Sequence, residues 1–124
     1  MPKDLGVQPD VETYTFFMSG VLTTKVGSLR VYMEVPCKVQ SVRASAGTAP
    51  TGATILVDAN KNGTTIYTTQ GNRPTIAISG FTALGGVAAN DTFAAGDYLT
   101  VDVDQIGSTV AGADLVVVVR MRRV

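Results

Sequence analysis

The chain has 124 residues, which suits one domain with one hydrophobic core. Only 16% of the residues are charged, and ten basic side chains balance ten acidic ones, so no net field attracts nucleic acid or anionic lipid. No apolar run reaches the ~20 residues that span a bilayer, and the first residues lack the pattern of a secretory signal. We therefore expect no nucleic-acid or membrane partner, synthesis in the cytoplasm, and a charge-poor surface suited to assembly.

Residues 1–11 contain two prolines and a glycine without any periodicity, which predicts an extended N-terminal arm before a domain over residues 12–124. Such an arm is suited to contact a neighbouring subunit. Its candidate contact residues are Lys3, Asp4, Leu5 and Val7.

Period-two alternation begins at Glu12 and returns over residues 29–35, which predicts two strands. Glycines between them predict that the two strands form an antiparallel hairpin. Residues 37–46 alternate again and lead into a loop of small residues at 46–53. Cys37 is interpreted as a small hydrophobic residue rather than a nucleophile, since the chain has no histidine to activate it.

Two β-branched segments, residues 54–58 and 64–68, flank an Asn62-Gly63 step, which is one of the strongest short-range signals for a β-hairpin. A further strand is predicted over residues 75–78. Residues 79–91 are predicted as a long loop, in which three apolar residues serve as anchors or form one helical turn. These residues are Phe81, Leu84 and Val87.

Near the C-terminus, Leu99, Val101 and Val103 alternate with polar residues, which predicts a half-buried strand with Asp102 and Asp104 facing solvent. The unbroken apolar run 115–119 predicts a strand covered on both sides, either centrally in the domain or by a partner. The whole pattern gives about eight strands and no helix. It predicts an all-β fold, a single antiparallel β-sandwich or jelly roll with an extended N-terminal arm.

Several segments carry a resemblance to a known module: the strand–turn–strand of residues 52–68, Arg73-Pro74-Thr75-Ile76, the run FAAGDYLTVDVDQIGS at 93–108, and AGADLVV at 111–117. In order and spacing they resemble a small β-sandwich module of tailed-bacteriophage virion proteins, found in head decoration (cement) proteins and also in tail and fibre proteins. The resemblance covers about residues 14–121.

The resemblance implies a structural virion protein, in the lead interpretation a capsid decoration protein that binds the outside of the head and stabilises it. The implied partners are the major capsid protein and copies of the chain itself, as a homotrimer, and the implied location is the capsid surface. The alternative is a tail- or fibre-associated module that binds a host-surface glycan or receptor, for example through residues 79–95.

Catalytic chemistry finds little support in the sequence. Without histidine there is no Ser-His-Asp triad and no histidine-based metal site. The aspartates at 97, 102 and 104 are interpreted as solvating a strand rather than as a hydrolytic pair. Residues 58–63 match the start of a calcium loop, but Thr69 stands where a bidentate Glu is needed, so a hairpin turn is favoured. We predict no enzyme activity, cofactor, metal or small-molecule substrate.

Three arginines near the end of the chain, Arg120, Arg122 and Arg123, complete the candidate interface. Arginine pairs with carboxylates at many protein interfaces, and it also serves as a solubilising end to an apolar strand. The sequence leaves both interpretations open.

Overall fold

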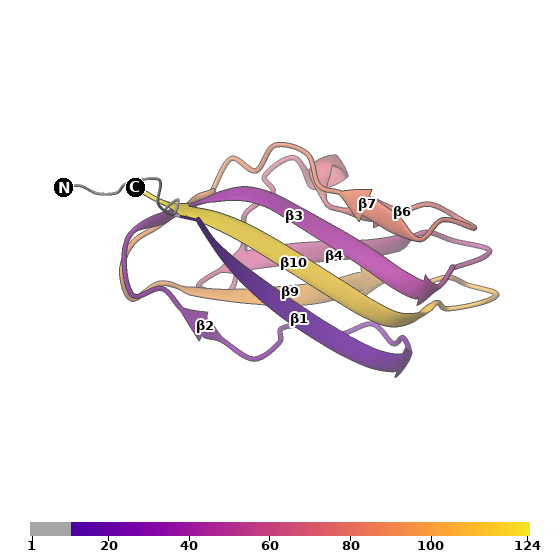
Figure 1. Cartoon of the computed structure of the whole chain (residues 1–124). Coiled ribbons are helices and arrows are strands. Elements are labelled where there is room, and N and C mark those ends of the chain that lie inside the picture. Colours follow the sequence, from indigo (N-terminus) through magenta and orange to yellow (C-terminus); the bar gives the residue numbers. More distant parts are fainter. Residues whose placement is uncertain (1–10) are drawn as a thin grey trace.

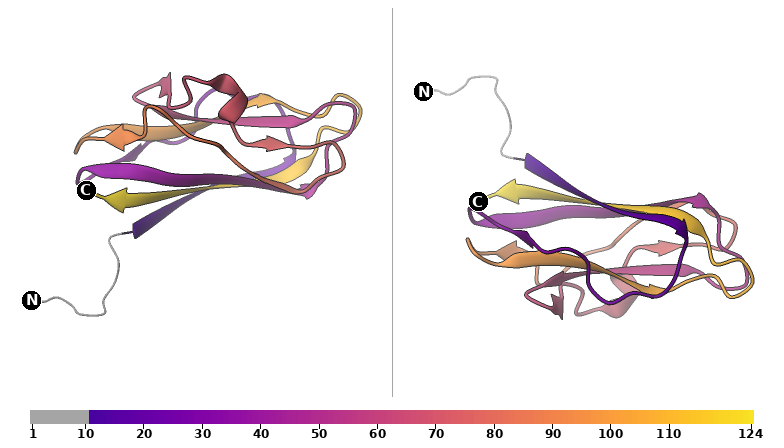
Figure 2. Two further views of the ribbon diagram at one scale, coloured as in Figure 1. Left: turned by 90° about the horizontal axis from the view of Figure 1, so that it is seen from above. Right: turned by 90° about the horizontal axis from the view of Figure 1, so that it is seen from below.

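The computed structural model describes residues 11–124, which form two antiparallel β-sheets packed face to face (Figures 1 and 2). Sheet A contains β1 (Val11–Val21), β10 (Ala113–Arg123), β3 (Cys37–Thr48) and β7 (Thr82–Leu84) in that order, with β8 (Thr92–Phe93) also paired to β3. Sheet B contains β2 (Val31–Tyr32), β9 (Tyr98–Gln105), β4 (Ile55–Lys61) and β5 (Thr64–Thr65), with β6 (Thr75–Ile76) also paired to β4. A 3₁₀ turn, η1 (Gln70–Asn72), is the only helical element in the described chain.

The strand order of the two sheets follows the jelly-roll pattern. When the short strands β6 and β8 are set aside, eight strands remain. If these eight strands are renumbered 1 to 8 along the chain, the order in sheet A becomes 1-8-3-6 and the order in sheet B becomes 2-7-4-5. Every neighbouring pair is antiparallel. This is the arrangement of two interlocked Greek keys. The predicted all-β sandwich is confirmed, with ten strands in residues 11–124 rather than about eight.

Side chains of alternating residues from both sheets fill the space between the layers. The core combines the large side chains of Tyr67 and Phe93 with many aliphatic residues, among them Val57, Val101 and Val117, all at most 1% exposed. Cys37 lies in this core, 1% exposed, and burial raises the pKa of its thiol. The interpretation of Cys37 as a small hydrophobic residue is confirmed.

The predicted hairpin between the first two strands is wrong. β1 pairs with β10 in sheet A, whereas the short β2 pairs with β9 in sheet B. The connection between them crosses from one sheet to the other and runs beside β9, where Lys25 and Val103 exchange backbone hydrogen bonds. Leu29, the first residue of the strand predicted over 29–35, is 87% exposed in this connection. Of that predicted strand, only Val31 and Tyr32 form β2.

The predicted loop over 79–91 contains a short strand, and neither the apolar anchors nor the alternative helical turn forms. Residues 82–84 form β7, which extends sheet A beyond β3. Ala83 faces the core opposite Ala44, while Phe81 and Leu84 are more than half exposed. The expected apolar anchors therefore point away from the core, because a small alanine fills the inward position.

The β4–β5 turn is formed as predicted. Both Asn62 and Gly63 have positive φ angles, 52° and 85°, as a two-residue type I′ turn requires. The Asn62 side chain joins this turn to the start of β9: its amide donates to Asp97 Oδ1 at 2.9 Å, and its oxygen accepts from the backbone of Tyr98 at 3.0 Å.

Two glycines in the C-terminal segments are required by the fold. A Cβ at Gly107 would lie 1.8 Å from the carbonyl oxygen of Val110, so the β9–β10 connection closes only around a residue without a side chain. Gly112 has a φ of 99°, and a Cβ there would lie 2.8 Å from Ile55 Cδ1. The nearby Val110 backbone explains Gly107, and the positive φ with the nearby Ile55 side chain explains Gly112.

β1 begins at Val11, and residues 1–10 lie outside the described part of the chain. The predicted arm over residues 1–11 is therefore tested only at Val11, which belongs to β1. Among residues 11–124, no helix is long and apolar enough to cross a membrane.

Candidate functional site

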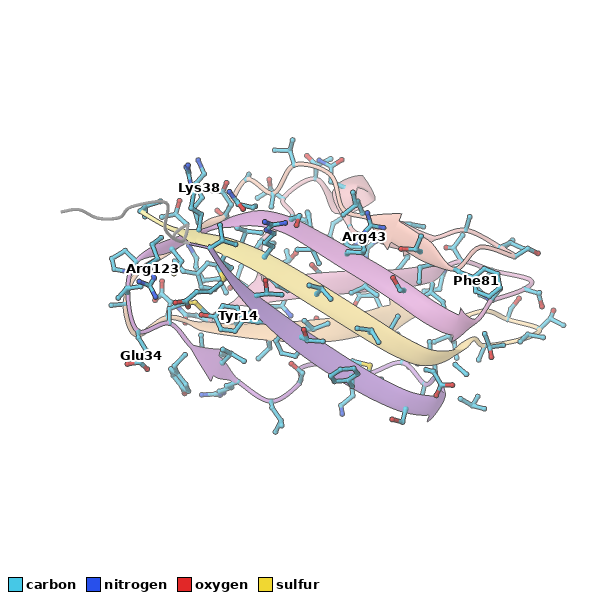
Figure 3. All side chains as sticks on the ribbon, viewed as in Figure 1. Tyr14, Glu34, Lys38, Arg43, Phe81 and Arg123 are labelled. Atoms are coloured by element: carbon cyan, nitrogen blue, oxygen red, sulfur yellow. The ribbon has the colours of Figure 1, made fainter. Side chains whose placement is uncertain are left out.

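The outer face of sheet A is open and faces away from sheet B (Figure 3). Cross-strand register places its outward side chains in rows. One row is Phe17, Val116, Ser45 and Thr82, and the next is Thr15, Val118, Arg43 and Leu84. Phe17 is 74% exposed, so the face presents apolar and small polar side chains to solvent.

Positive charge gathers on the same face. Arg120 lies opposite Thr13 and Ser41, and Arg122 lies opposite Val11 and Lys38. Arg43 also points outward and donates to Thr82 Oγ1 at 2.9 Å. Arg120 and Arg122 have no ion-pair partner among residues 11–124. The face therefore ends in two arginines that have no ion-pair partner in the described domain, in a chain whose net charge is zero.

Arg123 lies apart from the other two arginines of the predicted interface. It pairs with Glu12, which also accepts a hydrogen bond from Tyr14 Oη at 2.6 Å. The hydrogen bonds from Tyr14 and Arg123 lower the pKa of Glu12, while burial raises the pKa of Tyr14. Strand alternation explains the separation, because residues 120 and 122 share one face and residue 123 lies on the other. Lys3, Asp4, Leu5 and Val7 lie outside the described residues.

Exposed apolar side chains gather at both lateral edges of the sandwich. One edge, next to β1 and β2, carries Val21, Val26, Leu29 and Tyr32, which are 50–91% exposed. The opposite edge, next to β7, carries Ile78, Phe81, Leu84 and Val87, which are 50–80% exposed (Figures 1 and 3). Exposed apolar patches of this kind mark interaction surfaces in soluble proteins. We call these patches the β2 edge and the β7 edge.

The predicted solvent exposure of Asp102 is wrong. Asp102 is only 9% exposed, although it lies on the outer face of sheet B. The β1–β2 connection folds over it, and the backbone N–H of Gly27 donates to its carboxylate. Asp104 is more open and pairs with Arg73 at 2.8 Å. Asp97 caps a turn at the start of β9, accepting from the backbone of Ala94 at 2.8 Å.

The segment 58–63 does not wrap around a central point as a calcium loop does. Asp58 and Asn60 belong to the regular strand β4, and Asn62 binds Asp97 across the turn. Asp58 accepts hydrogen bonds from Thr65 Oγ1 and the Ala59 backbone, at 2.7 and 2.8 Å. Within residues 11–124 no group of three or more acidic, cysteine or histidine residues is placed to hold a metal ion.

A pocket that the sequence did not predict lies on the outer face of sheet B. It has a volume of about 270 Å³. Its lining comes from the β1–β2 connection, β4, the β4–β5 turn and β9: Val26, Gly27, Ser28, Arg30, Asn60, Gly63, Tyr98, Thr100 and Asp102. In the sequence, the pocket is signalled only by the polar residues at the outward positions of β9. Such residues are equally typical of a strand face that is exposed to solvent.

No family model matches the sequence, and no curated protein is similar to it at a significant level. The fold is similar to that of a chain in the capsid asymmetric unit of the cyanophage Pam1, with a TM-score of 0.54 and 16% sequence identity. The alignment covers 100% of this chain and 92% of that chain. At this identity the comparison establishes a shared fold.

Proposed function

We propose that the chain is a structural protein of a bacteriophage virion, which decorates the outside of the head and stabilises the shell through protein–protein contacts. The observation that carries the proposal is the shared fold, over the whole length of this chain, with a chain of a cyanophage capsid asymmetric unit. Fold alone does not decide function, so the proposal also depends on the surfaces of the chain.

The outer face of sheet A is the proposed docking surface toward the major capsid protein. Phe17, Val116 and Val118 supply apolar area, and Arg120 and Arg122, which have no ion-pair partner among residues 11–124, supply positive charge. This combination fits an acidic patch on the shell, since complementary charge gives register and specificity. Val11, to which residues 1–10 are joined, lies opposite Arg122, so the predicted arm and the arginines serve one contact.

Self-association would use the two lateral edges. The β2 edge and the β7 edge are different surfaces on opposite sides of the sandwich, so a contact between them is heterologous. Heterologous contacts close into a ring when the rotation between subunits allows it, and a closed ring of three is the predicted homotrimer at a symmetry point of the head. Burying ~800 Å² per partner at many copies adds a large total stabilisation from modest single contacts.

The proposed action needs no catalysis, cofactor or metal. Its support lies in the exposed apolar edges and in the exposed arginines of sheet A, which are features of association rather than of chemistry. The alternative function is a tail- or fibre-associated module that binds a host-surface glycan. The polar pocket on sheet B favours that alternative.

Fractionation of purified particles tests the proposal. Heads and tails are separated on a density gradient, and the chain is quantified in each fraction by mass spectrometry. Decoration predicts the chain in the head fraction, in fixed proportion to the major capsid protein. Its recovery with tails alone would support the alternative and overturn head decoration.

A further inference from the structure

We propose that the pocket on the outer face of sheet B binds one neutral, hydroxyl-rich sugar ring, with Asn60, Thr100 and Asp102 forming its floor. The site lies away from the outer face of sheet A and from the β7 edge, and of the β2 edge only Val26 lines it.

The floor of the pocket contains buried polar groups that the protein leaves unpaired. Asn60 and Thr100 lie directly opposite each other on β4 and β9, on the outward side of sheet B. They are only 6% and 7% exposed, yet neither side chain has a hydrogen-bond partner among residues 11–124. Buried polar side chains are nearly always paired, since leaving them unpaired is costly. Their position in an open pocket indicates a ligand that supplies the missing bonds.

The wall above the floor is fixed in place. The β1–β2 connection is held over β9 by the Gly27 N–H, which donates to Asp102, and by Ser28 Oγ, which accepts from the Val101 backbone at 2.9 Å. Arg30 lies 4.2 Å from the centre of the Tyr98 ring and donates to Tyr32 Oη at 3.1 Å. The pocket therefore exists before a ligand binds, as is usual for small-molecule sites.

The chemistry of the lining selects a neutral polyol. The Asn60 amide and the Thr100 hydroxyl each donate and accept, and the Asp102 carboxylate accepts, which matches hydroxyl groups that do both. Asp102 would repel an anionic ligand, and Arg30 would repel a cationic one. The lining therefore favours a neutral ligand. Val26, 91% exposed at the rim, offers an apolar contact for the C–H face of a sugar.

The size of the pocket agrees with this ligand class. A volume of about 270 Å³ lies just below the usual range of small-molecule sites, which begins at ~300 Å³, and it suits a single ring rather than a longer oligosaccharide. It is far larger than a metal ion needs. Asp102 is the only acidic residue in the lining, too few for a strong cation site.

The test is a titration of the isotope-labelled, full-length chain followed by amide chemical shifts in NMR. The probes are glucose, galactose, mannose, rhamnose and N-acetylglucosamine, with glucuronate and glucosamine as charged counterparts. We expect saturable shifts with at least one neutral sugar, in the ~mM range typical of a single small ring, centred on the amides of Gly27, Asn60 and Thr100. The charged counterparts should bind more weakly.

Thr100→Val separates binding from folding. The hydroxyl has no partner in residues 11–124, so its isosteric removal should leave the thermal midpoint unchanged or raised, while the affinity for the sugar falls by about tenfold. Asn60→Leu should act in the same direction. The matched control is Thr15→Val, which removes an exposed hydroxyl from sheet A and should leave binding unchanged.

Three results would overturn the site. A pocket that holds ordered water only would give no saturable shift with any sugar. Shifts that cluster elsewhere, for instance over residues 79–95, would place the sugar on another surface. Shifts that depend on protein concentration rather than sugar would identify a neighbouring subunit as the occupant. None of these results bears on whether the chain fractionates with heads.

Discussion

Asp58 and Asp102 lie directly opposite each other on β4 and β9, and both are buried on the outer face of sheet B, 5% and 9% exposed. Like charges at such positions repel each other across the strands. Burial raises the pKa of Asp58, and the charges of Asp104 and Asp102 add to the effect, while hydrogen bonds from Thr65 and Ala59 oppose it. The charged carboxylate of Asp58 therefore destabilises the folded protein at neutral pH.

Asp58→Asn should stabilise the protein at neutral pH. A folded pKa above the unfolded value means that Asp58 favours folding below about pH 4, and that this contribution is lost as pH rises through the folded pKa. The amide keeps the acceptor for Thr65 but carries no charge. Urea unfolding should show a gain for the variant at pH 7 that shrinks toward zero below about pH 4.

Asp97→Asn is the matched control for this titration. Hydrogen bonds from Asn62 and the Ala94 backbone lower the pKa of Asp97, so its contribution to stability is present at neutral pH and is lost as pH falls through the folded pKa. Asp97→Asn should therefore destabilise the protein at pH 7. A stabilising Asp97→Asn, or an Asp58→Asn gain that persists in acid, would contradict the electrostatic account.

Gly107→Ala should destabilise the domain by about 2–4 kcal/mol. The new Cβ would lie 1.8 Å from the Val110 carbonyl oxygen, so the β9–β10 connection must open. Thermal unfolding followed by circular dichroism measures the loss. Gly71→Ala is the control, because a Cβ there meets nothing within 4 Å, and it should change stability by less than about 0.5 kcal/mol. Equal effects at the two positions would argue against the backbone contact.

Arg120→Glu should weaken binding to purified heads by at least about tenfold without changing the thermal midpoint. The side chain is exposed and has no ion-pair partner among residues 11–124, so reversing its charge breaks no ion pair of the described domain and acts on the proposed contact with the shell. Lys25→Glu, which makes the same charge change beside β9 in sheet B, is the control. Cosedimentation at several salt concentrations measures both variants. Equal loss for both would indicate a general charge effect rather than docking through sheet A.

Deleting residues 1–10 should reduce occupancy on heads while the domain remains folded. The described part of β1 begins at Val11, and its pairs with β10 extend from Val11 to Val21. The midpoint of thermal unfolding should therefore change by less than a few degrees, and the affinity for heads should fall. Unchanged occupancy would remove the arm, with Lys3, Asp4, Leu5 and Val7, from the interface.

Short-range signals in the sequence predicted much of the fold. The Asn62-Gly63 step predicted the turn that forms, and the alternation at 99–103 predicted the inward residues of β9. Alternation also separates Arg120 and Arg122 from Arg123, a distinction that the sequence offers directly. Such features depend on backbone geometry within one strand or one turn.

The features that the sequence did not predict depend on the path of a connection between the sheets. Asp102 is buried because the β1–β2 connection folds over β9, which no local pattern specifies. The pocket above Asn60 and Thr100 exists for the same reason. Likewise, β7 forms because Ala83 fits opposite Ala44, a pairing of residues far apart in the chain.

Cryo-electron microscopy of particles that contain the chain would locate it on the virion. Head decoration predicts sandwich-shaped density at regular positions on the outside of the head, with sheet A and its arginines toward the shell and the β2 and β7 edges in contact around a symmetry axis. Density confined to the tail, or docked on the head through sheet B, would contradict it.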